Sequence, residues 1–291
     1  MTGSPDTHPL GTAAVAATDG EVTLLQAARS QAAEAAARAR VRVRPLHGID
    51  DMRAAADVLD EIWGTDQSNP QLDPRLMVAI EEAGGYVVGV TDEADLLVGA
   101  AVGFPRQPEG LHSHIAGVLP RSALRGVGTA VKLHQRAWCL ERGMRSVTWT
   151  FDPLVSRNAH LNLVTLGARV DHYLVDVYGP MRDALNRGDP SDRLLVRWPL
   201  ASAGRQDVQA SGPRVVREGP DGAPVFSPAP SHEELLLVAV PGDIENLRRS
   251  NPAVALQWRM SVRQALLGAL AEGRAIVGFD AANNYVIGAR P

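Results

Sequence analysis

A strand that runs through a glycine-rich turn directly into an amphipathic helix constrains the fold of this chain more than any other feature. It occupies residues 115–142, where the letters V-L-P-R-S-A-L-R-G-V-G end the strand and open the helix. Apolar residues recur at helical spacing from Thr129, and Gly143 is placed to end the helix. Gly126 and Gly128 let the backbone approach a ligand, and the free N–H groups of a first helical turn attract anions. The turn therefore predicts a diphosphate site.

Other phosphate-binding turns fit these glycines less well. The dinucleotide fingerprint G-x-G-x-x-G needs a third glycine, but Val131 stands at that position. A P-loop needs a Lys-Ser or Lys-Thr pair after its glycines, whereas Thr129 and Ala130 follow Gly128 here. A tight turn with a purely structural role remains the alternative to a phosphate site.

The turn resembles the motif V-x-P-x-x-[QR]-x-x-G-x-[GA] of the GNAT superfamily of acyl-CoA N-acyltransferases. Val118 and Pro120 set the register, which places Ala123 at the Gln/Arg position and Gly126 and Gly128 at the two small positions. In this family the diphosphate of the acyl-CoA is held mainly by backbone N–H groups, so Ala123 is compatible with binding. The resemblance thus implies acetyl-CoA or another acyl-CoA as co-substrate, without a metal.

A second register of the motif starts at Arg125 and loses the spacing to the Val-x-Pro pair, so we prefer the first. Arg125 can still supply a charge to the diphosphate. The resemblance implies that the backbone around Val118 contacts the pantetheine and the oxyanion. The expected cofactor-binding residues of the strand end and turn are Gly117, Val118, Ala123, Leu124, Arg125, Gly126, Val127, Gly128 and Thr129.

Composition narrows the class of protein. The chain has 291 residues, enough for one large domain or for a domain with a smaller partner. A formal net charge of −4 does not favour nucleic acid or an anionic membrane as partner. Apolar runs such as residues 96–104 are shorter than the roughly 20 residues that span a bilayer. No signal-peptide pattern begins the chain. We therefore expect a cytoplasmic protein.

Periodicity predicts the order of elements that the GNAT fold has. We expect an α/β protein with a central, mostly antiparallel mixed sheet flanked by helices. The expected elements are a strand from Val41, helices at 50–63 and 73–82, strands at 86–91 and 96–104, the strand and helix of the turn, a strand at 146–151, a helix at 156–166 and a strand at 169–178.

Longer blocks resemble one branch of predicted GNAT acyltransferases. They include W-T-F-D-P, S-R-N-A-H-L-N-L and Y-G-P-M-R-D-A-L-N-R-G-D-P, and V-P-G-D-I and Q-W-R-M-S-V-R continue the resemblance toward the C-terminus. Residues 200–230 are rich in Gly, Pro, Ser and Asp and are expected to connect two parts, with at most one short strand. The chain then divides into a disordered tail with an Ala-rich helix (1–40), a GNAT domain (41–200), a linker (201–230) and a small β-α-β-β extension that docks on the sheet (231–291).

A second family motif, N-x-x-A-x-x-x-Y-x-x-x-G-[FA], matches only in part. Its alanine and glycine are present, but Ser156 replaces the asparagine and Leu163 replaces the tyrosine. In the family this tyrosine usually protonates the departing CoA thiolate. Asn158 and Asn162 lie one helical turn apart and are expected to contact the pantetheine amides instead.

The strand that leads into Val118 offers a candidate base. His112 and His114 share one face of it, because side chains alternate along a strand. An imidazole with a pKa of about 6.5 suits removal of a proton from an amine, and we select His114. The alternatives are two ordinary strand histidines or an H-x-H metal site, which no second ligand cluster supports.

Four further residues are candidates for chemistry or for the core. Asp152, before Pro153 at a strand end, is a second candidate base or a turn former. Tyr173 is selected as the acid that replaces the missing tyrosine, with Tyr178 as the alternative; either can instead be a sheet aromatic. The single cysteine, Cys139, lies inside the helix after the turn and is expected to pack in the core.

These features together predict an acyl-CoA-dependent N-acyltransferase that acts on an amine of a small molecule by direct attack, with acetyl-CoA as the simplest donor. The branch resemblance implies an alternative, N-succinyl or other acyl transfer to an amino acid, for which two of Arg157, Arg169 and Arg193 would bind a carboxylate. A CoA-binding protein without activity is the third hypothesis, motivated by Ala123 and Leu163. A homodimer is left open.

Overall fold

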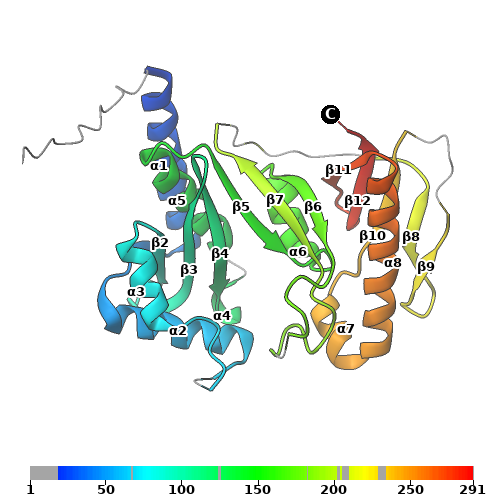
Figure 1. Cartoon of the computed structure of the whole chain (residues 1–291), viewed down its shortest axis with the longest axis horizontal. Helices are drawn as coiled ribbons and strands as arrows, with labels where there is room; N and C mark the ends of the chain where they lie inside the picture. Colours follow the sequence, from blue (N-terminus) through cyan, green and yellow to red (C-terminus); the bar gives the residue numbers. More distant parts are fainter. Residues whose placement is uncertain are drawn as a thin grey trace, which may run out of the picture.

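The computed structural model describes residues 19–66, 68–123, 126–181, 183–201, 204, 210–228 and 234–290. It contains two sheets that lie side by side along the long axis of the molecule (Figure 1). The first sheet has the strand order β1-β2-β3-β4-β5-β7-β6. Its strands are β1 (Arg42–Pro45), β2 (Tyr86–Thr91), β3 (Leu97–Arg106), β4 (Gly110–Val118), β5 (Ser146–Phe151), β6 (Arg169–Leu174) and β7 (Arg193–Pro199).

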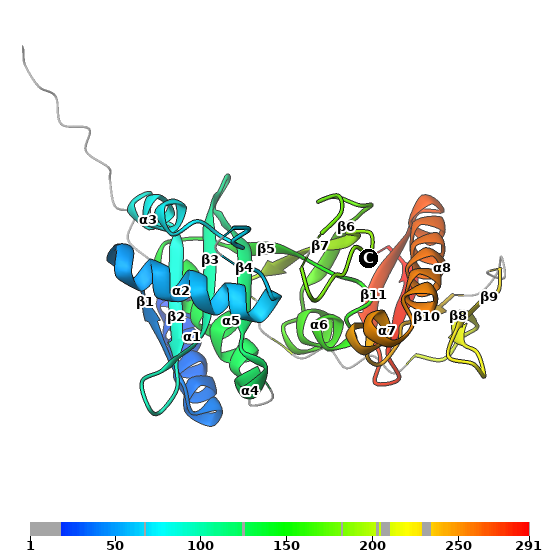
Figure 2. The same cartoon turned by 90° about the horizontal axis from the view of Figure 1, so that it is seen from below.

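Helices cover both faces of this sheet. The described helices here are α1 (Asp19–Ala39), α2 (Gly48–Trp63), α3 (Pro74–Glu82), α4 (Pro120–Ala123), α5 (Val127–Glu141), α6 (Ser156–Ala159) and the π-helical turn η1 (His160–Thr165). Figure 2 shows α2 and α3 on one face and α1 and α5 on the other. The apolar side of α2, with Met52 and Leu59, packs on Val87 and Val102 of the sheet. The mixed α/β fold expected from the GNAT resemblance is confirmed.

Strands β4 and β5 separate from each other inside the first sheet. Both strands are fully described, and they pair in parallel at three positions: Gly110 with Ser146, Leu111 with Val147, and His112 with Thr148. Beyond His112, β4 continues along β3, whereas β5 continues along β7. The two strands therefore diverge as a wedge that opens toward α4 (Figure 1).

A β-bulge marks the point of divergence. Opposite β4, Val102 pairs with Ile115 and Gly103 with Ser113, so His114 is the extra residue. A bulge of this kind bends the strand and redirects its side chains. The bend in β4 therefore begins two residues after its last pair with β5.

The second sheet is larger than the sequence predicts. It has the order β11-β12-β10-β8-β9 and carries α7 (Ile244–Ser250) and α8 (Pro252–Ala271). Its strands are β8 (Arg214–Glu218), β9 (Pro224–Phe226), β10 (Leu236–Ala239), β11 (Arg274–Phe279) and β12 (Asn284–Ala289). Strands β8 and β9 fall in the stretch expected to be a linker. They are short and bounded by Pro and Gly, and pairing with β10 defines β8.

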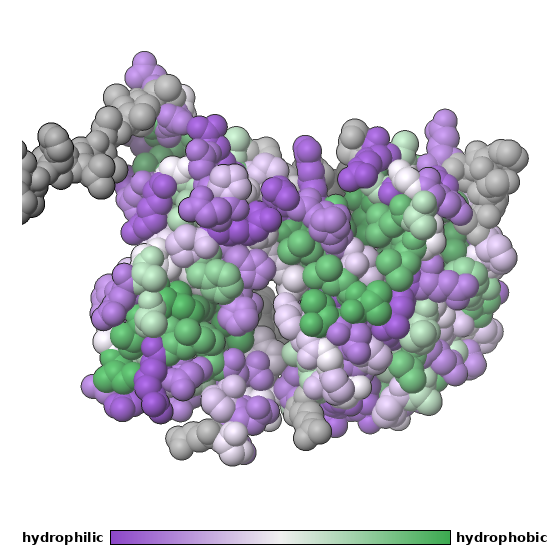
Figure 3. Space-filling model, in the orientation of Figure 1, coloured by the Kyte–Doolittle hydropathy of each residue, from purple (hydrophilic) through white to green (hydrophobic). Residues whose placement is uncertain are grey.

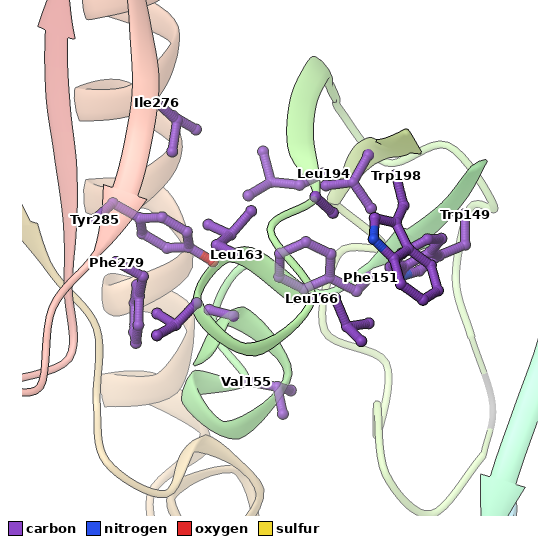
Figure 4. Packing of buried hydrophobic residues seen from close by; sticks show 14 of the residues in the cluster. Trp149, Phe151, Val155, Leu163, Leu166, Leu194, Trp198, Ile276, Phe279 and Tyr285 are labelled. Atoms are coloured by element: carbon purple, nitrogen blue, oxygen red, sulfur yellow. The ribbon is translucent and has the colours of Figure 1, made fainter. Parts of the chain in front are cut away.

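One apolar core runs from the first sheet into the second. Its centre is the helix formed by α6 and η1, which contacts β11. In Figure 4, Tyr285 of the second sheet points toward Leu163, while Phe151 and Trp149 lie on the other side. The hydroxyl of Tyr285 donates to the carbonyl of Pro153 at 2.8 Å. The second sheet therefore packs on the first through this helix.

Candidate active site

The glycine turn opens α5 as expected. Gly126 is the N-cap residue with φ 77° and ψ 16°, a left-handed conformation that favours glycine. The first N–H groups of α5, from Val127, Gly128 and Thr129, have no intrahelical acceptor, because an α-helix leaves its first donors free. The N-cap residue, being glycine, makes no side-chain cap hydrogen bond. The start of α5 can therefore bind an anion.

The surroundings of Gly128 leave its backbone accessible. A Cβ placed on Gly128 would lie 3.6 Å from Leu161 Cδ2, an ordinary contact. Helix η1 thus borders the first turn of α5, and Asn158 lies one turn before Leu161. Leu124 and Arg125, both expected to bind the cofactor, lie outside the described residues, and the side chain of Ala123 is likewise not described.

The wedge has one wall made by β4 and α2. A Cβ on Gly117 would lie 2.5 Å from Trp63 Cζ3, so glycine is needed where the last turn of α2 meets β4. Val118 follows at the end of the strand and is partly exposed. Because residues 113–118 have no pairing with β5, the peptide groups on that edge of β4 face the wedge.

On the face that carries α2, two histidines lie beside the bulge. The rings of His112 and His114 both contact the ring of Phe104, at centroid distances of 5.3 and 5.9 Å, so they share one face as predicted. Nδ1 of His112 lies 3.3 Å from Thr148 Oγ1, across the last pair with β5. Burial lowers the pKa of both imidazoles below the ordinary 6.5, and for His112 the charges of Arg106 and other neighbours add to it. Both rings are thus neutral at pH 7.

Tyr178 forms part of the opposite wall on the same face. Its hydroxyl lies 2.9 Å from Thr150 Oγ1, and the guanidinium of Arg193 lies 5.6 Å from the centre of its ring. Thr150 belongs to the part of β5 that has left β4. The hydroxyl of Tyr178 therefore lies at the wedge, and it is better placed than Tyr173 to meet a substrate.

The connection between β6 and β7 crosses the wedge on this side. The backbone N–H of Ala184 donates to the carbonyl of Trp63 at 2.9 Å, and a Cβ on Gly64 would approach Ala184 Cβ to 2.6 Å. The connection thus runs from Tyr178 beside β5 to the end of α2 beside β4. Figure 3 shows the narrow cleft between these two halves of the molecule. Two other surface hollows, on α2 with α3 and on α1 with β1, lie away from it.

On the face that carries α5, a buried lysine occupies the vertex of the wedge. The ammonium of Lys132 donates to Ser113 Oγ at 3.0 Å and to Gln135 Oε1 at 3.1 Å, and it lies 4.0 Å from the ring centre of Trp149. Gln135 Nε2 donates to the same Ser113 oxygen at 3.2 Å. Sequence reasoning missed this lysine. Its signal was a charged residue between the apolar Val131 and Leu133 of the predicted amphipathic helix.

Asp152 is not a base, which corrects one of the expectations. Its carboxylate accepts hydrogen bonds from Arg248 Nη2 at 2.6 Å and Arg259 Nη2 at 2.9 Å, and Asp189 lies against the same two guanidiniums. Burial alone would raise the pKa of Asp152, but the two arginines outweigh it and hold the pKa well below its usual range. The residue joins β5 to the second sheet instead of binding protons near neutral pH.

Tyr173 is not placed to act as an acid, which corrects a second expectation. Its hydroxyl donates to Asp192 Oδ2 at 2.5 Å, and Arg263 of α8 donates to the same carboxylate. Burial, and next the hydrogen bond to Asp192, raise the pKa of Tyr173 well above its ordinary value. The residue is a buried sheet aromatic that helps to hold α8.

The helix after β5 is partly used for packing. Leu163, at the family's tyrosine position, is buried and faces Tyr285 in Figure 4, so this position belongs to the core between the sheets. Asn162 is also buried, whereas Asn158 is partly exposed. Their contact with a pantetheine stays a prediction. Arg157, one of the candidate carboxylate ligands, pairs with Glu245 of α7.

Two other expectations concern reactivity. Cys139 is buried, and burial raises the pKa of its thiol to about 12, so it is core rather than nucleophile. Within the described residues, no group of three or more His, Cys, Asp and Glu is arranged to hold a metal ion. The helices of this described part include none that is both long and apolar enough to cross a membrane.

Several solved structures are similar to this one. The ribosomal-protein-S18-alanine N-acetyltransferase of Escherichia coli matches with a TM-score of 0.45 and 14% identity, over 56% of this chain and 96% of its own. A GNAT superfamily phosphinothricin acetyltransferase of Sinorhizobium meliloti, in complex with AcCoA, has a TM-score of 0.45 and 15% identity over 57% and 89%. A spermidine N-acetyltransferase chimera based on the Vibrio cholerae enzyme gives 0.44 and 11% over 56% and 96%. No protein-family model and no curated protein sequence matches the chain.

Proposed function

We propose that the chain is an acyl-CoA-dependent N-acyltransferase of the GNAT type, which transfers an acyl group to an amine of a small molecule. The observation that carries the proposal is the wedge between β4 and β5, with the first turn of α5 at its open end. An extended arm between the strands can bond to their unpaired peptide groups while its diphosphate binds the N–H groups after Gly126. This arrangement supports a CoA thioester as ligand.

The acceptor amine enters from the α2 face in this proposal. Trp63 and Tyr178 stand on the two sides of that entrance, with the bulge of β4 behind them. His114 is the more exposed of the two histidines and is assigned as the base that takes the proton of the attacking amine, directly or through water. His112, held against Thr148, supports it from the strand. The β4 backbone at the bulge supplies the donors for the developing oxyanion.

The simplest donor is acetyl-CoA. N-succinyl transfer to an amino acid remains the alternative, and of the arginines weighed for a carboxylate, Arg193 contacts the Tyr178 ring while its guanidinium also donates to Asn186. The third hypothesis is a CoA-binding protein without catalytic activity. The presence of two histidines, a tyrosine hydroxyl and a buried lysine around the wedge argues against it, because an inactive binding protein has no need of these groups in one place.

Two assays on the purified protein test the proposal. In a thermal-shift screen with CoA, acetyl-CoA, succinyl-CoA and NAD, a ligand of the native state stabilises by RT ln(1 + [L]/Kd), about 2.7 kcal/mol at 100 times Kd. In the second assay, release of free thiol is followed with each acyl-CoA and a panel of polyamines and amino acids. A shift with acyl-CoA and amine-dependent thiol release are expected. Stabilisation by NAD alone, or by no CoA compound, would contradict the proposal.

A further inference from the structure

Lys132 closes the vertex of the wedge from the α5 side. Ser113 is the first β4 residue beyond the last pair of β4 with β5, and Trp149 is the first β5 residue beyond it. The ammonium lies 3.0 Å from Ser113 Oγ and 4.0 Å from the centre of the Trp149 ring. It therefore sits between the two strands at the place where they part.

The environment of this ammonium is unusual for a structural lysine. The Lys132 side chain is buried, with a residue exposure of 7%, and its described partners are a hydroxyl, an amide oxygen and an indole ring rather than a carboxylate. Burial of a charge without an opposite charge is costly, and a protein core would normally have a leucine or methionine at such a position. Perturbed ionisable groups of this kind cluster at functional sites.

In the proposed binding mode, the sulfur of the ligand reaches this vertex. The diphosphate would bind at the first turn of α5, and Lys132 follows Val127 by five residues, about 7.5 Å along the helix axis. An arm that starts at the diphosphate and runs between the strands moves from the open end, beside Val118, toward Ser113. The thioester at the end of the arm then meets Lys132 on the α5 face and the histidines on the α2 face.

We propose, on the basis of the proposed acyl transfer, that Lys132 is the acid that protonates the departing CoA sulfur. The acceptor nitrogen bonds to the carbonyl carbon, the C–S bond breaks, and its electron pair leaves with the sulfur. The ammonium of Lys132 gives that sulfur a proton and becomes a neutral amine. The proton lost by the acceptor nitrogen goes to His114, and solvent reprotonates Lys132 after CoA leaves. Ser113 and Gln135 hold the donor N–H groups in place.

The acidity of the group suits this role. Burial lowers the pKa of Lys132 from 10.5 to about 7, opposed in part by the Cys139 thiol on the same helix. Lys132 also interacts through charge with His112 on the opposite face of β4, whose own pKa it lowers, while β5 presents the Trp149 ring. A thiol with a pKa of about 8.5 takes a proton readily from an acid with a pKa of about 7. Because the protonated form is the active one, the acyl transfer rate falls as pH rises through about 7.

The experiment measures the single-turnover rate of acyl transfer from pH 5.5 to 9. It uses an acyl-CoA together with an amine that was found to cause release of free CoA thiol. The wild-type protein is expected to lose rate on the alkaline side with an apparent pKa near 7. Lys132→Met and Lys132→Arg should each lower the rate at pH 6.5 by about 10²–10⁴-fold and lose the alkaline limb. Arginine keeps the charge but does not release its proton. Acyl-CoA affinity should change by less than about threefold.

Arg136→Met is the matched control. It also removes a buried cation from α5, but Arg136 faces α1 and the carbonyl of Leu200, so only stability should fall. If Lys132→Arg keeps the rate of the wild type, proton donation by Lys132 is overturned. The same follows if the wild-type protein loses no rate at alkaline pH, a measurement that does not depend on the folding of a variant. If no acyl-CoA binds or turns over, the proposed function itself fails. If the wild-type protein turns over acyl-CoA and the Lys132 variants do so at the same rate, only the role of Lys132 fails and the proposed function stands.

Discussion

Arg259 donates to Asp152 across 107 residues of sequence, with 2.9 Å between Nη2 and Oδ2. Both side chains are buried, and Arg248 and Asp189 complete a cluster of two carboxylates and two guanidiniums. Asp152 directly follows β5, whereas Arg259 lies within α8. The strand that forms one wall of the wedge is therefore anchored in the second sheet.

Removing one member of this cluster should destabilise the protein strongly. Asp152→Asn leaves two buried guanidiniums with one carboxylate between them, and breaking such a pair costs about 3–5 kcal/mol. Denaturant unfolding measures the change. Arg157→Gln, which removes an ion pair between an exposed arginine and Glu245, is the control and should cost under about 1 kcal/mol. Equal, small losses in both variants would show that the cluster does not hold the two sheets together.

Stability should depend on pH through the same carboxylate. The folded pKa of Asp152 is depressed below its unfolded value of about 3.9, so its contribution is fully present above about pH 4 and is lost as pH falls through the folded pKa. The free energy of unfolding of the wild type should therefore drop more steeply below pH 4 than that of Asp152→Asn. Parallel curves for the two proteins would place the acid-sensitive carboxylate elsewhere.

Gly128→Ala should separate stability from cofactor binding. A Cβ fits at this position, 3.6 Å from Leu161, and alanine favours a helix over glycine by about 1 kcal/mol. The same methyl group would stand between the α5 backbone and a diphosphate. We expect an unchanged or higher Tm and at least tenfold weaker acyl-CoA binding by calorimetry. Gly268→Ala, a helical glycine in α8 with open space around it, is the control that should leave affinity unchanged.

The two histidines should differ in their effect on catalysis. His114→Gln removes the assigned base and should lower kcat/KM by about 10²–10⁴-fold, whereas His112→Gln should cost less because its Nδ1 lies against Thr148. Burial lowers the pKa of His114, so the acidic limb of the pH profile of activity should have an apparent pKa below 6.5. If kcat/KM of the His114 variant stays within about twofold of wild type, another group is the base.

Local patterns in the sequence predicted most of the first sheet. Strands β2 and β5 have the predicted bounds, and α5 starts two residues before its predicted start at Thr129 because Gly126 is its N-cap. Strands β8 and β9 were not predicted with these bounds, since pairing with β10 and not alternation defines β8. The extent of the second sheet therefore depended on contacts distant in sequence.

The candidate site was only partly predictable. The glycine turn and the shared face of His112 and His114 follow from local spacing, which sequence shows directly. The roles given to Asp152 and Tyr173 depended on neighbours 107 and 19 residues away, so their partners Arg259 and Asp192 could not be foreseen from a strand end alone. Lys132 was missed because only the three-dimensional wedge shows that α5 places it between the strands.

Hydrogen–deuterium exchange with and without acetyl-CoA tests the binding mode most directly. The account predicts slower exchange at the unpaired edge of β4 (residues 113–118), at the end of β5 and in the first turn of α5, since the ligand would bond to those N–H groups. Strands β11 and β12 should be unaffected. Binding of acetyl-CoA that protects other segments and leaves β4 and the start of α5 unchanged would contradict the account.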